Sequence, residues 1–164
     1  MFGFQFKASR SLLLAALVLS AASTSVHARL GDTLAKLTEH FGKPPPQEKK
    51  AAVFWLFEGE DGQLVYTVTF NAKGVSIAEG LKPLKYARLP RETAENFIDG
   101  QLGPLRGSKT SKVVNPGEKY VFAGKTFVCA EQEYVIVDDA NGMLIVWTKS
   151  GLPFVMVVGP EMMK

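Results

Sequence analysis

Three short runs rich in β-branched and aromatic residues decide the fold: Ala52-Val-Phe-Trp-Leu-Phe57, Gln63-Leu-Val-Tyr-Thr-Val-Thr-Phe70 and Val75-Ser-Ile-Ala78. Glycine-containing turns separate them, and the second turn is Asn71-Ala-Lys-Gly74. The middle run alternates, so that its apolar and its smaller polar side chains point to opposite sides. The stretch therefore predicts an antiparallel meander with one apolar face, and that face needs a cover.

Two amphipathic helical patterns can supply the cover. The first is expected to start at an N-cap, Asp32, and to run to Phe41, where Gly42 and Pro44 stop it. The second is expected to open at Pro90 and to end before Gly103. Its inner face carries apolar residues at helical spacing, namely Ala94, Phe97, Ile98 and Leu102.

The second half of the chain contains a further set of strand patterns. Residues 106–119 have no periodic pattern and are predicted to form a loop. Four strand candidates follow, and Asn141-Gly142 is predicted to be the hairpin turn between the last two. A final strand, 154–158, would close the sheet. The four candidates are residues 120–123, 126–132, 134–138 and 143–148.

The two halves of the chain are similar to each other. Residues 66–75 align without gaps with residues 134–143, so that Gly74 and Gly142 coincide. Chance similarity between amphipathic hairpins is the alternative to a tandem repeat. We expect an α+β fold with two similar helix-then-antiparallel-meander units, residues 29–84 and 85–164, in one compact domain. The helices should cover the sheet on one side.

The N-terminal segment 1–28 has the features of a secretory signal peptide. Lys7 and Arg10 precede an apolar run at residues 11–20, and Val26-His-Ala28 resembles a cleavage site. The predicted mature chain starts near Arg29, is exported to the periplasm or secreted, and has no membrane span. An uncleaved N-terminal anchor is the alternative. The segment carries two of the positive charges behind the formal net charge of +3, so we expect no nucleic-acid partner.

Residues that commonly carry chemistry are scarce after residue 28. Cys129 is the only cysteine and is predicted to be a buried, inert thiol, and His40 is the only histidine of the predicted mature chain. Neither has the neighbours that a nucleophilic pair or a zinc site requires. We therefore expect no catalytic, metal or cofactor site and no enzyme activity. Acidic turn residues such as Asp138 and Asp139 are predicted to be solvated.

A candidate protein interface lies in the second half, on the side of the sheet away from the helices. This side carries Val135, Val137, Leu144 and Val146, all apolar, whereas the matching positions of the first half suit water. These first-half positions are Val65, Thr67, Thr69, Ser76 and Ala78. A monomer rarely leaves such an apolar patch bare. Either another part of the chain covers it, such as loop 106–119 or the first unit, or it binds a partner.

The segment Gly31-Asp-Thr-Leu34, followed by Phe41-Gly-Lys-Pro44 and an aromatic strand, resembles two related groups of proteins. One comprises small outer-membrane assembly lipoproteins, and the other comprises secreted β-lactamase inhibitor proteins built from helix-plus-sheet repeats. The chain departs from the lipoproteins because it lacks a lipid-attachment cysteine. The resemblance implies a non-enzymatic role. We expect a secreted or periplasmic protein-binding module whose partner is another protein or itself; the alternative is an envelope structural or assembly factor.

Overall fold

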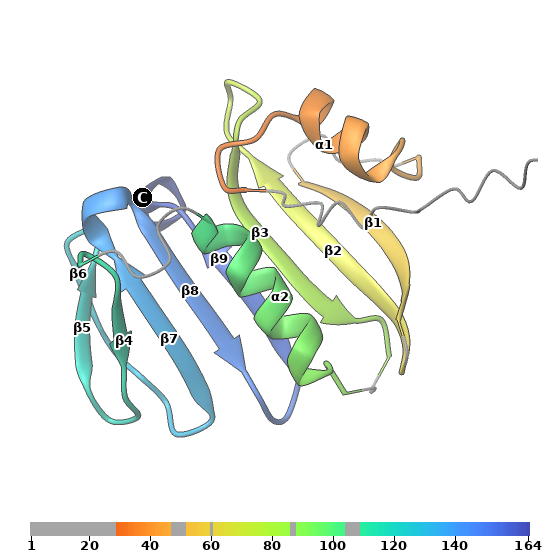
Figure 1. Cartoon of the computed structure of the whole chain (residues 1–164). Coiled ribbons are helices and arrows are strands. Elements are labelled where there is room, and N and C mark those ends of the chain that lie inside the picture. The colour runs from red at the N-terminus through yellow and green to blue at the C-terminus, as the bar shows by residue number, and fades with distance from the viewer. Residues whose placement is uncertain (1–28, 47–51, 60, 86–87, 104–108) are drawn as a thin grey trace, which may run out of the picture.

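A computed structural model describes residues 29–46, 52–59, 61–85, 88–103 and 109–164, which form an α+β fold with an antiparallel sheet (Figure 1). The predicted signal segment lies outside the described residues. The helices are α1 (Leu34–Phe41) and α2 (Arg91–Leu102), with short 3₁₀ turns η2 (Asp139–Asn141) and η3 (Pro160–Met163). The strands are β1 (Ala52–Gly59), β2 (Gly62–Phe70), β3 (Ser76–Pro83), β4 (Lys112–Val114), β5 (Lys119–Phe122), β6 (Lys125–Val128), β7 (Glu133–Asp138), β8 (Met143–Thr148) and β9 (Phe154–Val158).

Seven of the strands form one antiparallel sheet in the order β1-β2-β3-β9-β8-β7-β4. The first three strands are the predicted meander, and β7 and β8 are the predicted hairpin. The last strand, β9, lies between them and pairs with β3 on one side and β8 on the other (Figure 1). The remaining strands, β5 and β6, form a separate two-stranded sheet.

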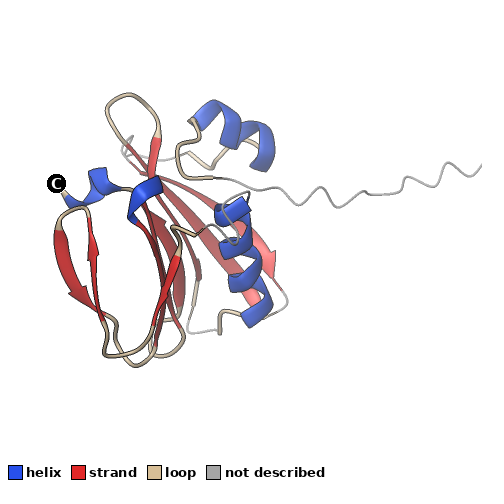
Figure 2. Ribbon diagram, turned by 60° about the vertical axis from the view of Figure 1, so that its left-hand side comes forward, coloured by secondary structure: helices blue, strands red, loops and turns tan. Residues whose placement is uncertain are grey.

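Both helices lie on one side of the seven-stranded sheet, as expected (Figure 2). Leu37 of α1 and Ala94, Ile98 and Leu102 of α2 pack with inward side chains of the strands, including Tyr66 and Ile145, in the main core. The start of α1 differs from the prediction by one residue. The N-cap is Thr33, whose hydroxyl oxygen accepts from the Lys36 backbone N–H at 3.4 Å. Asp32 is buried and has a different role, described below.

The β5–β6 hairpin covers half of the opposite side of the sheet (Figure 2). Tyr120 and Phe122 of β5 and Cys129 pack there with side chains of β7, β8 and β9 in a second core. Two polar contacts fix the hairpin tip. The Ala123 backbone N–H donates to the Asp139 carboxylate at 3.0 Å, and the Lys125 ammonium donates to the Met163 carbonyl.

Several local predictions are confirmed, and others are wrong. Gly74 and Gly142 have φ values of 73° and 63°, so both turns use the left-handed region. The segment predicted as loop 106–119 contains strand β4, because Val113 and Val114 pair with Ile136 and Val135 of β7. The predicted strand 126–132 ends at Val128 in the structure.

Candidate functional site

The predicted interface of the second half lies inside the protein. Val135, Val137 and Leu144 are buried in the second core, and Val146 is half-buried at its edge. The β5–β6 hairpin covers them, with the ring of Phe122 fully buried against this group. The patch is therefore covered by the chain itself. The main cover is the β5–β6 hairpin, and the two segments that the sequence suggested add Val114 of residues 106–119 and Ala78 of the first unit to the same core.

The corresponding face of the first half has no such cover among the described residues. In β1 the side chains of Phe54 and Leu56 point to this side and are 36% and 45% exposed. They pair across the strands with Thr67 and Val65 of β2. None of the described residues of β1 or β2 belongs to the second core. We call the outer side of these strands the open face and define it by Phe54, Leu56, Val65, Thr67 and Thr69. Phe54 and Leu56 are its exposed residues, whereas Val65 is buried.

The open face was not predicted, because the two halves of the sequence were compared only over the runs 63–70 and 75–78 and not over the run 52–57. Of the five positions expected to suit water, Val65, Ser76 and Ala78 are buried, whereas Thr67 and Thr69 are half-buried. The alternation of side chains in the run 52–57 could have revealed that Phe54 and Leu56 are exposed. Val53 and Trp55 belong to the main core, so Phe54 and Leu56 must point away from it.

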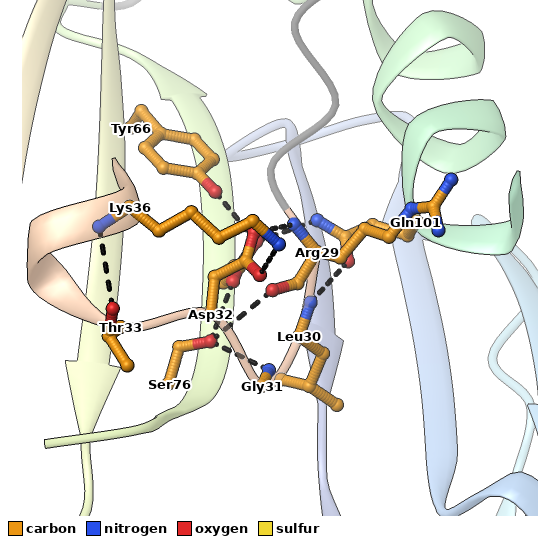
Figure 3. A network of polar contacts seen from close by, with 10 residues as sticks. Arg29, Leu30, Gly31, Asp32, Thr33, Lys36, Tyr66, Ser76 and Gln101 are labelled. Atoms are coloured by element: carbon orange, nitrogen blue, oxygen red, sulfur yellow. Dashed lines mark hydrogen bonds and ion pairs between the residues drawn. The ribbon is translucent and has the colours of Figure 1, made fainter. Parts of the chain in front are cut away.

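A second feature is a buried polar network centred on Glu79 of β3, whose side chain is 1% exposed (Figure 3). The Tyr66 hydroxyl donates to Oε2 at 2.6 Å, and Gln101 Nε2 of α2 donates to the same oxygen at 2.7 Å. The Ser76 hydroxyl donates to Oε1 at 2.8 Å. Glu79 therefore connects β2, β3 and α2 inside the main core.

The carboxyl of Glu79 is surrounded by neutral donors. Among the described residues the ion pairs are Lys36–Asp32 and Arg91–Glu95, so neither involves Glu79. Burial raises the pKa of Glu79, because a charge is costly away from water, and the three hydrogen bonds oppose this rise. Burial and the adjacent Glu79 charge also raise the pKa of Tyr66 far above its usual range, so the phenol stays protonated and donates.

The network extends to the first described residues of the chain (Figure 3). The Leu30 backbone N–H donates to Gln101 Oε1 at 3.0 Å, and the Gly31 N–H lies 2.8 Å from the Ser76 hydroxyl oxygen. The Arg29 N–H donates to Asp32 Oδ2 at 3.0 Å. Glu79 thus organises the attachment of residues 29–32 to the sheet and to α2.

Glu79 was not among the residues singled out from the sequence, although a signal was present. In β3 it lies two residues before Leu81, on the side of the strand that faces the main core. A carboxylate at an inward position indicates a buried polar network. Its role here is structural, because its position and its three protein donors leave it 1% exposed.

The other candidate residues lie apart from this network. Cys129 is a buried free thiol, as predicted, and burial raises its pKa. His40 is exposed near the end of α1. Asp138 was predicted to be solvated, but it is fully buried and accepts hydrogen bonds from Thr110, Ser111 and Asn141. It therefore connects the two residues that precede β4 to the turn after β7. Within the described ranges, no group of three or more His, Cys, Asp or Glu residues could hold a metal ion.

None of the described helices is both long and apolar enough to cross a membrane. Comparison with family models, with curated proteins and with solved structures finds no match to this chain.

Proposed function

We propose that this protein is an exported, non-enzymatic protein-binding module that uses the open face to bind another protein. The observation that carries the proposal is the unequal covering of the sheet. The hairpin buries the apolar outer face of one half, while Leu56 on the same side of the other half is 45% exposed. Exposed aliphatic and aromatic residues on the same side of one strand are typical of a contact surface.

The covered half indicates what kind of partner fits the open face. On β7 and β8 the cover is an antiparallel segment that places the aromatic side chains of Tyr120 and Phe122 on aliphatic residues. The open face has exposed Leu56 on β1, which pairs antiparallel with β2. The expected partner therefore presents an extended segment with apolar or aromatic side chains, in the place that the hairpin takes on the other half.

We also propose that the two halves are related units, as the sequence alignment suggests. The sheet order supports this, because β1, β2 and β3 lie on one side of β9 while β4, β7 and β8 lie on the other. In this correspondence β2 matches β7 and β3 matches β8, and their turns both contain a left-handed glycine. The β5–β6 hairpin is then an insertion of the second unit, which explains why, among the described residues, a hairpin covers that half and not the other.

Export is part of the proposal and rests on the sequence of residues 1–28. The composition of that segment is typical of a cleaved signal. Mass spectrometry of the exported fraction from a Gram-negative host should find a mature chain that starts at or near Arg29. An exported protein that retains Met1 would contradict this cleavage.

The binding proposal is tested by a photo-crosslinking amino acid at position 56 in the exporting host. Position 152 is the matched control, since Leu152 is 73% exposed and belongs to the turn between β8 and β9. We expect one defined adduct from position 56 and none of the same mass from position 152. With the crosslinker at position 54 as a second reporter, Leu56→Lys should abolish the adduct and Leu152→Lys should not.

The outcomes separate the competing functions. An adduct with the mass of two copies of this chain would mean self-association. A soluble heterologous adduct supports the binding module, whereas an adduct that fractionates with membranes supports the alternative, an envelope structural or assembly factor. No adduct at position 56, or equal adducts at both positions, would reject the open face as a binding surface. Unchanged unfolding midpoints must accompany both lysine variants.

A further inference from the structure

Arg29 is the residue that follows the predicted cleavage site, and its backbone nitrogen contacts a carboxylate. It donates to Asp32 Oδ2 at 3.0 Å, and Asp32 is 7% exposed. The Asp32 backbone N–H in turn donates to the Arg29 carbonyl at 3.0 Å, which closes a tight turn. The predicted new N-terminus therefore lies beside a buried carboxylate.

Residues 29–32 are held from several sides, so this position is fixed. The Ser76 N–H donates to the Asp32 carbonyl at 2.9 Å, and the Gly31 N–H donates to the Ser76 carbonyl at 3.1 Å. Thr33 forms a β-bridge with Val75. The Arg29 guanidinium lies close to Gly103, the C-cap residue of α2, and the C-terminal end of a helix attracts a cation.

Two carboxylates, Asp32 and Glu79, and two cations, Lys36 and the Arg29 guanidinium, lie around this turn. The carboxylates of Asp32 and Glu79 lie close enough for their charges to interact, and Tyr66 is the third titratable group of the cluster. The Lys36 ammonium pairs with Asp32 Oδ1 at 2.6 Å, but its side chain is largely exposed. It contacts the oxygen of Asp32 that the Arg29 nitrogen does not contact.

We propose that the α-ammonium group of Arg29, formed by removal of residues 1–28, is a structural ligand of the fold that pairs with the buried Asp32 carboxylate. This inference rests on the proposed cleavage after Ala28, and it assigns that cleavage a role in the stability of the product. The processed protein gains a charge-assisted bond where the precursor has an amide hydrogen bond.

The chemical step is hydrolysis of the Ala28–Arg29 peptide bond by a peptidase, with water as co-reactant. The carbon–nitrogen bond breaks, and the water oxygen stays with Ala28 as part of its carboxylate. Both water hydrogens end on the Arg29 nitrogen, which becomes an ammonium with three N–H donors. One donor keeps the hydrogen bond to Asp32 Oδ2. The added positive charge also interacts favourably with the nearby carboxylate of Glu79.

The test compares chains with defined N-termini, released from a fusion by a site-specific protease. One chain starts at Arg29, and the other starts at Val26, which moves the ammonium three residues upstream. All described secondary structure lies within both chains. Each chain is made with Asp32 and with Asp32→Asn, which gives four proteins. Their unfolding free energies, measured in urea at pH 7, give the coupling free energy between the N-terminal ammonium and Asp32. We expect a coupling of about tenfold or more in the unfolding equilibrium constant, equivalent to about 1.4 kcal/mol.

A second measurement keeps the test decisive if Asp32→Asn does not fold. NMR titration of the selectively labelled Arg29 nitrogen should place the α-ammonium pKa about one unit or more above its ordinary value near 8. The extra stability should be present below that ordinary value and should be lost as the pH rises through the raised pKa. A coupling factor near one, or an α-ammonium pKa in the ordinary range, would overturn the proposal. Cleavage at another bond would instead appear in the mass of the exported protein.

Discussion

Replacing Glu79 by alanine should destabilise the protein far more than replacing it by glutamine. Glutamine keeps the shape of the side chain and an oxygen that can accept from Tyr66 and Gln101, and its amide can donate to the Ser76 oxygen. Alanine leaves three buried donors without their acceptor. At about 1–3 kcal/mol for each unsatisfied group, Glu79→Ala should lose about 3 kcal/mol or more. Glu79→Gln should lose little at pH 7, because it also removes a desolvated charge.

The pH dependence of stability separates the two effects. Because the pKa of Glu79 is raised by burial, the folded state keeps the proton at a pH where the unfolded chain has released it. The contribution of this residue therefore falls as the pH rises from about 4.5 through the folded pKa, by about 1.4 kcal/mol for each pH unit that separates the folded and unfolded pKa values. Urea unfolding between pH 4 and pH 8 should show this loss in the wild type.

In Glu79→Gln this contribution should be absent. The reasoning is refuted if Glu79→Ala is as stable as Glu79→Gln at pH 7. It is also refuted if the difference in unfolding free energy between wild type and Glu79→Gln does not change across this pH range.

Three further predictions concern the second core and the turns. Phe122→Ala should lower the unfolding free energy by about 3–5 kcal/mol in urea denaturation, because it empties a fully buried site of the second core; a loss below about 1 kcal/mol would show that the hairpin is not packed there. Val137→Lys combined with Leu144→Lys should unfold the protein by circular dichroism, because both charges would be buried without partners; a folded variant would contradict the second core. Gly74→Val should lower the unfolding free energy by about 1–2 kcal/mol, because the turn places this residue in the left-handed region. Gly142→Val should lower it more, because its Cβ would also lie 3.3 Å from Pro160 Cδ. Equal denaturant midpoints for wild type and both variants would contradict the turn assignment.

The local elements could be predicted from the sequence because their signals are short-range. The alternation in β2, the glycine turns and the apolar spacing of α2 each lie within a few residues of one another. The sharing of one sheet face by the two helices also followed from the pattern, since an apolar face must be covered. Strand β4 was missed because three residues are too few to show a period of two.

The arrangement of the outer face could not be predicted because it depends on where the β5–β6 hairpin folds back. Phe122 alternates with exposed Val121 just as the residues of a sheet strand would, so the pattern cannot show which surface receives it. This one placement converts Val137 and Leu144 from a candidate interface into core residues. It also leaves Leu56, which has no distinguishing signal in the sequence beyond its alternation with Trp55, at the surface.

The central place of β9 has a consequence for the order of folding. Its five residues follow all the other described strands in the sequence, yet they join β3 to β8. A nascent chain that ends before Phe154 has two separate meanders, each with an unpaired inner edge, and no continuous sheet. The sheet can therefore close only after β9 has been synthesised. Until then each meander lacks its partner, and the main core lacks Val155 and Val157.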